Sequence, residues 1–231
     1  RSCARRQIAD PGSPGPTNAG GWRRVTGPAP PGSVVNAQHP SPVVCANHEV
    51  AHRVADMVMA ALCQLTPRTV MAGSQGTSAV ITFGGLDYRT GDRFVSYESV
   101  KGGFGARTTK DGINAVASSV SNMSNTPIEI SEMSFPLRVA EYALIPDSGG
   151  AGKYRGGVPF LRDYRFLEGE GMLQVRSDRR DHRPFGLYGG SPGGPSENYL
   201  NPDGENRLLP SKLTMTIKRG DIFRHVLAGA G

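Results

Sequence analysis

The chain has 231 residues, 37% of them hydrophobic, with a mean hydropathy of −0.35 and a formal net charge of +6. This length fits one large domain or two small ones, and the most apolar stretch, VADMVMAALCQL, is far shorter than the roughly 20 residues that a membrane span needs. The basic excess lies at the two ends, with +4 in residues 1–30, −1 in residues 31–175 and +3 in residues 176–231, which argues against a nucleic-acid-binding protein.

The three cysteines are widely spaced and form no C-x-x-C motif: Cys3, Cys45 and Cys63. An odd number at such spacing favours reduced thiols over a disulfide framework or a structural zinc site. We therefore expect a cytoplasmic protein.

The N-terminal part contains one clear helix. Residues 1–31 are rich in proline, glycine and arginine without apolar periodicity, which predicts an extended arm. After a short extended piece, GSVVNAQHPSPVV, the apolar spacing predicts a helix from about Cys45 to Leu65. Its apolar residues share one arc of the helical wheel, which predicts a buried stripe: Val50, Val54, Met57, Val58, Ala61, Leu62 and Leu65.

From residue 79 the pattern changes to strands and tight turns. SAVITFGGLDY and RFVSYESV, joined by RTGD, predict a hairpin. Further strands are expected in LRVAEYALI, VPFLRDYRFLE, GMLQVRS and KLTMTIK, the last with a period of 2 that indicates burial of one face. We predict an α+β fold with a helix-containing first half and a largely antiparallel β second half. The expected sub-regions of residues 32–231 are about 32–134 (α+β) and 135–231 (mainly β).

The predicted helix carries the motif H-E-x-x-H, from His48 to His52, in which two histidines one turn apart bind zinc in zinc proteases. No acid that could serve as a third ligand occurs in the downstream segment TPRTVMAGSQGTSAVITF, and Arg53 would place a positive charge beside the metal. Both histidines lie outside the apolar stripe. A polar helix edge explains them better than a zinc site.

Several loops are rich in glycine or in uncharged polar residues. SGGAGKYRGG (148–157) fails both the Walker A and the dinucleotide-binding spacing, so a connection between two strands is its simplest interpretation. In YESVKGGFGAR (97–107), Glu98 ends a strand and is followed by glycines that let backbone approach a ligand. SQGT (74–77) and SNMSNTPIE (121–129) are commonly turns and caps, but together with Glu98 they form a candidate polar pocket. RSDRRDHRPFG (176–186) is more typical of a surface salt-bridge network than of a binding site.

Read in order, these segments resemble the hydantoinase B/oxoprolinase family. The resemblance rests on PPGSVVNAQHPSPVV, NHEVAHRVADMVMAAL, AGSQGT, YESVKGGFGAR, SNMSNTPIEISEMSFPLRV, SGGAGKYRGG, DRRDHRPFGLYGG and LPSKLTMTIKRGDIF, and it covers about residues 25–231. The helix matches a family pattern, N-x-E-x-x-x-R-x-x-D, through Asn47, Glu49, Arg53 and Asp56. Because family members are much longer, the chain looks like a C-terminal portion, and a region that looks metal-binding is expected in the missing N-terminal half.

The resemblance implies ATP-dependent opening of a cyclic amide or ureide such as a hydantoin or 5-oxoproline. An A-type partner subunit would bind ATP and phosphorylate the ring carbonyl, and the B-type component would complete the ring opening in a hetero-oligomer. Glu98 is the candidate catalytic base, with the backbone N–H groups of Gly102 and Gly103 as oxyanion donors. The remaining candidate substrate-binding residues are Gln75, Asn125, Thr126, Glu49 and Arg53.

Two alternatives stay open. One is an acetone-carboxylase-type large subunit, a relative within the same superfamily that would depend on bicarbonate and a ketone. The other is a non-catalytic assembly fragment. No nucleic acid or membrane is expected among the partners.

Overall fold

A computed structural model describes residues 27–44, 48–65 and 69–231. The chain divides into two compact units, residues 1–70 and residues 71–231. Most of the predicted arm (1–31), together with Cys3, Cys45 and Asn47, lies outside the described residues.

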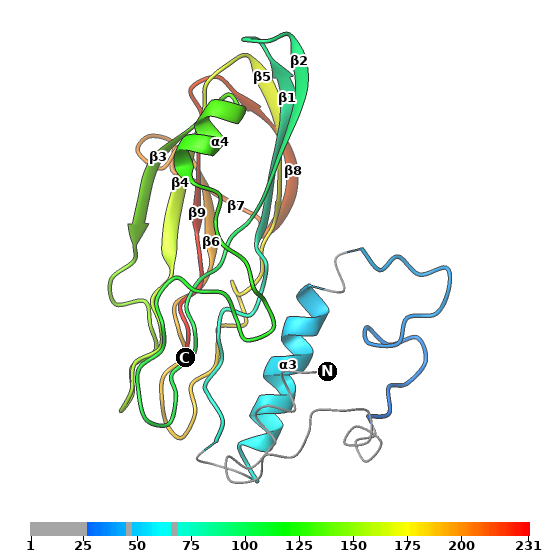
Figure 1. Cartoon of the computed structure of the whole chain (residues 1–231), viewed down its shortest axis with the longest axis vertical. Coiled ribbons are helices and arrows are strands. Elements are labelled where there is room, and N and C mark those ends of the chain that lie inside the picture. Colours follow the sequence, from blue (N-terminus) through cyan, green and yellow to red (C-terminus); the bar gives the residue numbers. More distant parts are fainter. Residues whose placement is uncertain (1–26, 45–47, 66–68) are drawn as a thin grey trace. The chain divides into compact units, whose positions relative to one another are not determined.

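The described residues of the first unit form a short turn-rich segment and the helix α3 (Glu49–Leu62) (Figure 1). The helix was predicted, and it is shorter than the expected range at both ends. The predicted burial of its apolar arc is wrong: Met57 and Leu65 are 63% and 79% exposed, whereas His52 and Met59 are its buried residues. A helical wheel identifies which side chains share a face, but it does not say which face meets protein.

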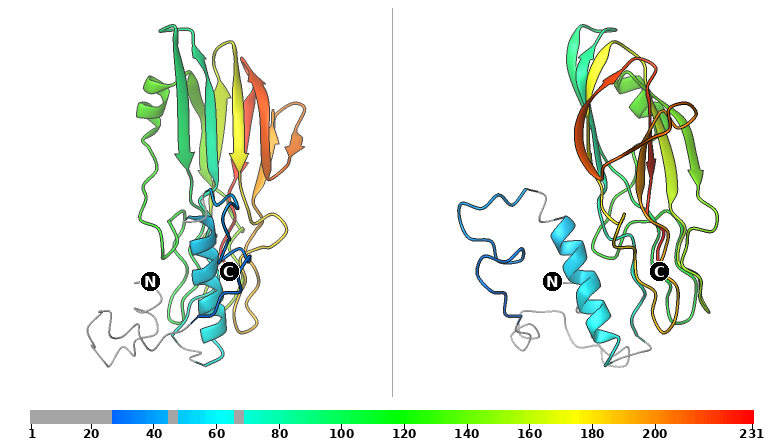
Figure 2. Two further views of the ribbon diagram at one scale, coloured as in Figure 1. Left: turned by 90° about the vertical axis from the view of Figure 1, so that its right-hand side faces the viewer. Right: turned by 180° about the vertical axis from the view of Figure 1, so that it is seen from behind.

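The second unit is built around two antiparallel sheets that lie face to face (Figures 1 and 2). The first sheet has the order β2 (Asp92–Ser99), β1 (Val80–Asp87), β5 (Glu170–Arg176), β8 (Lys212–Lys218). The second has the order β3 (Leu137–Leu144), β4 (Phe160–Phe166), β9 (Ile222–Val226), β6 (Glu197–Leu200), β7 (Arg207–Leu209). A short helix, α4 (Ile128–Ser134), precedes β3. The α+β class is confirmed.

Strand alternation determines which side chains enter the core. The predicted hairpin is confirmed, with register from Val80 opposite Ser99 to Asp87 opposite Asp92. Its inward residue Phe83 meets Phe223 of the second sheet, with ring centroids 6.3 Å apart. On β8 the alternation predicted from KLTMTIK is also confirmed, because its lysines and threonines are exposed and its apolar residues are not.

One end of this sandwich, opposite the β1–β2 turn, is a layer of glycine-rich loops that pack backbone against backbone (Figure 2). Gly103 shows how tight this layer is, since a Cβ there would lie 2.0 Å from the carbonyl oxygen of Gly157. Any side chain would collide with backbone atoms that cannot rotate away. Among the described residues, neither helix is long and apolar enough to cross a membrane.

Candidate active site

The structure places six of the eight predicted site residues in the second unit. Glu98 lies on β2, Gln75, Gly102 and Gly103 lie in the loops at the glycine-rich end, and Asn125 and Thr126 lie just before α4. The other two, Glu49 and Arg53, lie on α3 in the first unit.

Glu98 is at the centre of a buried polar cluster between the two sheets. It faces inward on β2 and is 9% exposed. Arg162, on β4 of the opposite sheet, donates from Nη1 to Glu98 Oε1 in an ion pair, and Tyr164 donates its hydroxyl to Glu98 Oε2 at 2.5 Å. One carboxylate therefore joins the two layers of the sandwich.

The protonation states of the two donors agree with this arrangement. Burial raises the pKa of Tyr164 well above its ordinary value, and the adjacent Glu98 charge raises it further, so the phenol keeps its proton. Burial by itself would lower the pKa of Arg162, but Tyr164 and Glu98 outweigh this effect and raise it. The guanidinium, which is 2% exposed, therefore stays charged inside the core.

Asn125 is connected to this cluster through Tyr142 on the edge strand β3. Asn125 Nδ2 donates to the Tyr142 hydroxyl at 2.7 Å, and the Arg162 guanidinium carbon lies 4.2 Å from the centroid of the Tyr142 ring. This cation–π contact links the loop before α4 with the ion pair of Glu98. Two predicted site residues, Glu98 and Asn125, thus belong to one network.

A second group of buried polar residues begins at His225 of β9, which is the register partner of Arg162. His225 is 1% exposed, and its Nδ1 lies 2.6 Å from Asn198 Oδ1. Asn198 Nδ2 in turn donates to Ser177 Oγ at 3.0 Å and to the carbonyl oxygen of Pro210 at 3.1 Å. Burial, assisted by the charge of Arg162, lowers the pKa of His225 to about 3, so the imidazole is neutral at physiological pH.

Gln75, Gly102 and Gly103 form a second group within the glycine-rich layer. The Gln75 N–H donates to the Gly103 carbonyl at 2.9 Å, and the Gly103 N–H donates to the Ala228 carbonyl at 3.2 Å. A Cβ on Gly102 would lie 2.4 Å from the Ala228 carbonyl oxygen, which is backbone, and 1.9 Å from Gln75 Oε1, so this position requires glycine. The Gly103 N–H is thus already engaged within the layer.

Arg179 supports the same loop, although its segment was expected to be mainly a surface salt-bridge network. Its Nε donates to the Gln75 carbonyl at 2.8 Å and its Nη2 to the Ser74 carbonyl at 3.2 Å. Its φ of +73° is unusual for a residue with a side chain. Arg180 likewise donates to a backbone carbonyl, that of Leu209, at 2.6 Å.

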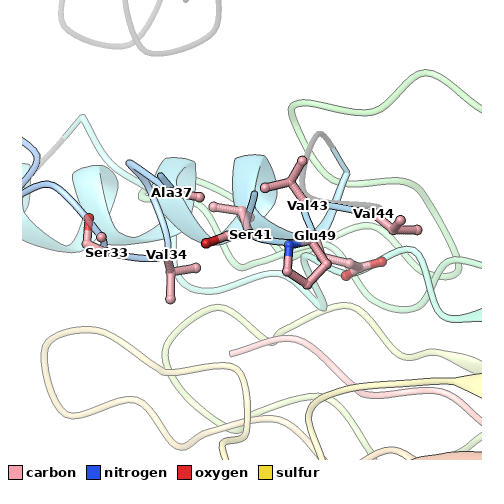
Figure 3. Close-up of a pocket in the computed structure, with 10 residues that line it drawn as sticks. Ser33, Val34, Ala37, Ser41, Val43, Val44 and Glu49 are labelled. Carbon is pink, nitrogen blue, oxygen red and sulfur yellow. The ribbon is translucent and has the colours of Figure 1, made fainter. Parts of the chain in front are cut away.

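The remaining predicted residues are more exposed. Thr126 is exposed ahead of α4. On α3, Arg53 Nη1 lies 3.4 Å from Asp56 Oδ2, and Glu49 lines a pocket of about 360 Å³ (Figure 3). Glu49 is the charged member of an otherwise apolar and hydroxyl-bearing lining: Gly32, Ser33, Val34, Ala37, Ser41, Pro42, Val43, Val44 and Val50.

Sequence reasoning missed Arg162, Tyr164, Tyr142, His225 and Arg179. A signal existed for the first two, because Phe160, Arg162, Tyr164 and Phe166 alternate on one face of a strand and place a charge among aromatic residues. Within residues 27–44, 48–65 and 69–231, His, Cys, Asp and Glu side chains form no cluster of three or more that could hold a metal ion.

Comparison with known proteins connects this arrangement to a family of enzymes. The chain is 36% identical over its whole length to an uncharacterised protein, MJ0963, of Methanocaldococcus jannaschii, of which it covers 39%. It is 34% identical to a putative B-type subunit of a D-/L-hydantoinase from a Pseudomonas species, over 86% of the chain and 33% of that protein. The chain also matches the crystal structure of the ATP-dependent caprolactamase from Pseudomonas jessenii, with a TM-score of 0.80 and 25% identity. The match covers all of this chain and 41% of the caprolactamase chain.

The chain therefore spans about two fifths or less of the length of these relatives. The sequence profile of the hydantoinase B/oxoprolinase family matches residues 3–231. The chain belongs to the hydantoinase B/oxoprolinase family.

Proposed function

We propose that the chain is part of the B-type component of a cytoplasmic, ATP-dependent cyclic amide hydrolase. It would open hydantoin-like, 5-oxoproline-like or lactam rings together with an A-type subunit that binds ATP. The observation that carries the proposal is the family match over residues 3–231, supported by relatives that include a B-type hydantoinase component and a caprolactamase.

The chemistry explains why such a reaction needs two components. A ring amide is a poor electrophile because its nitrogen donates electron density to the carbonyl carbon. Transfer of a phosphoryl group from ATP to the carbonyl oxygen, assigned to the A-type partner, makes that carbon reactive toward water. The B-type component then has to position the activated ring, take a proton from water and stabilise the charge that develops on oxygen.

Glu98 remains the proposed base, and its surroundings define what this role requires. Each of its oxygens already accepts one hydrogen bond, from Arg162 or Tyr164, and each keeps a second lone pair. A base held in this way has a defined orientation, but its 9% exposure requires water to reach it through the polar cluster. Substrate contacts are proposed for Gln75, Asn125, Thr126, Glu49 and Arg53, and an oxyanion contact for Gly102. Gly103 could join it only if its N–H released the Ala228 carbonyl that it contacts in this structure.

Reconstitution tests the proposal. The chain would be co-expressed with an A-type subunit from the same source, with and without the additional B-type region that the relatives carry. ATP-dependent opening of 5-oxoproline, hydantoin and caprolactam would then be measured. We expect ring opening that needs ATP, the A-type subunit and this chain together. A stable complex that contains all B-type regions but opens none of these rings would contradict the proposal.

The same preparation distinguishes the carboxylase-type alternative. Consumption of ATP that depends on bicarbonate and a ketone, without ring opening, would assign the complex to that class. A Glu98→Gln variant that assembles normally and loses ring opening would support the proposed base, and full activity of that variant would end it.

A further inference from the structure

Arg162 and His225 lie opposite each other on adjacent strands of the second sheet. They are paired in the register of β4 and β9. These two strands are neighbours in the second sheet (Figure 1). Directly opposite residues of an antiparallel pair have Cβ atoms roughly 4.5–5.5 Å apart. Both side chains are buried, at 2% and 1% exposure, so bulk water does not satisfy their polar atoms.

The hydrogen-bonding state of His225 follows from its neighbours. The Pro210 carbonyl can only accept a hydrogen bond, so the Asn198 atom 3.1 Å from it is the amide nitrogen. Asn198 Oδ1 therefore faces His225, and Nδ1 of the histidine carries the proton that Oδ1 accepts at 2.6 Å. In a neutral imidazole this leaves Nε2 as an acceptor with a bare lone pair, and Nε2 is buried without a donor among the described residues.

Arg162 has the complementary deficit. Its Nη1 donates to Glu98 and lies 3.3 Å from the Tyr164 hydroxyl, whereas Nε and Nη2 are buried without an acceptor among the described residues. Its charge is already compensated by Glu98. What Arg162 lacks is an acceptor for its remaining N–H groups rather than another anion.

We infer that one buried water molecule bridges Arg162 and His225, accepting a hydrogen bond from the guanidinium Nε or Nη2 and donating one to His225 Nε2. Water fits because it is small, uncharged and able to accept and donate at the same time. A metal cation would be repelled by Arg162, and an anion without a proton has nothing to donate to Nε2. Leaving these buried groups without partners would be costly, and internal water is the usual way in which such groups are satisfied.

The water completes a polar row across four strands of the second sheet. Tyr142, Arg162, His225 and Asn198 are successive register partners on β3, β4, β9 and β6. The row begins at Asn125, which donates to Tyr142, and ends at Ser177, which accepts from Asn198. By holding the far side of the guanidinium, the water keeps Nη1 directed at Glu98.

The wild-type chain tests this inference by two measurements. A crystal structure at a resolution that orders internal water should show one water within about 2.7–3.2 Å of His225 Nε2 and of an Arg162 nitrogen. In ¹⁵N NMR of histidine-labelled protein, His225 should be the neutral Nδ1–H tautomer, with its Nε2 signal shifted in the direction of a hydrogen-bonded acceptor. A direct hydrogen bond between Arg162 and His225 with no density between them, or an Nε2–H tautomer, would overturn it.

His225→Phe provides the matched variant, because it keeps an aromatic ring on Phe223, whose plane lies at 16° to the imidazole. The variant assigns the His225 NMR signals by their loss, and its crystal structure should lack the bridging water. A water that stays in place at unchanged occupancy would show that His225 does not hold it. If the variant does not fold, the two wild-type measurements still decide, and neither depends on ring-opening activity.

Discussion

Replacement of Glu98 by glutamine should destabilise the protein strongly, whatever its effect on turnover. Glutamine keeps the size of the side chain and an oxygen that can accept from Tyr164, but it leaves the charge of Arg162 uncompensated in a site where Arg162 is 2% exposed. Removal of one partner from a buried ion pair costs about 3–5 kcal/mol, because the remaining charge stays desolvated. This is a large part of the roughly 5–15 kcal/mol that stabilises a typical domain.

Urea unfolding of the purified chain, followed by circular dichroism and by fluorescence, measures this loss. With a denaturant dependence of about 2 kcal/mol per molar, the midpoint of Glu98→Gln should fall by roughly 1.5–2.5 M. Asp178→Asn is the matched control, because it breaks the ion pair of Asp178 with Lys212 at 2.6 Å, whose side chains are 37% and 64% exposed. An exposed pair of this kind contributes about 1 kcal/mol or less.

A second arm separates the pair from its burial. Glu98→Leu combined with Arg162→Met and Tyr164→Phe removes all three polar groups together and leaves no buried charge behind. This triple variant should be clearly more stable than Glu98→Gln, since a buried ion pair replaced as a whole is often neutral or stabilising. If Glu98→Gln shifts the midpoint no more than Asp178→Asn does, the account of Glu98 as the centre of a buried cluster is wrong.

Three further outcomes are expected. The free energy of unfolding should fall as the pH is lowered from about 6.5 toward 3, because the unfolded chain binds a proton at His225 that the folded protein, with a pKa of about 3 there, does not bind. The loss is at most roughly 5 kcal/mol. Urea titrations of His225→Phe should show a correspondingly flatter pH dependence. Gly103→Ala should prevent folding or cost at least about 3 kcal/mol of stability, because its Cβ would lie 2.0 Å from a backbone oxygen. The control Gly84→Ala, whose Cβ would have its nearest atom at 3.6 Å, should leave the protein equally or slightly more stable. Thermal unfolding of both variants measures the difference. Tyr142→Phe removes the hydroxyl that Asn125 contacts but keeps the aromatic ring on the Arg162 guanidinium. In the assembled enzyme this variant should raise KM several-fold with little change in kcat. An unchanged KM would count against a substrate contact by Asn125.

Local patterns in the sequence predict most of the longer elements of this fold and single out candidate site residues, but they do not predict α4, β6, β7 or β9. The period-2 alternation of KLTMTIK and the turn between SAVITFGGLDY and RFVSYESV indicate strands and a hairpin without reference to the rest of the chain. The ordered glycine and polar segments likewise identify Gln75, Gly102 and Asn125 as residues of interest. These signals are readable because backbone period and turn chemistry are decided by residues next to one another in the chain.

The tertiary structure alone decided which distant residues meet. Glu98 and Arg162 are 64 residues apart in the chain, and their contact exists because β2 and β4 belong to opposite sheets whose inner faces meet. His225 lies beside Arg162 only through the register of β4 and β9. The exposure of α3 is explained in the same way. The sequence determines which apolar side chains of the helix share a face, but their burial depends on what packs against that face. Periodicity specifies the face of each element, but the pairing of faces depends on the energy of the whole packed core.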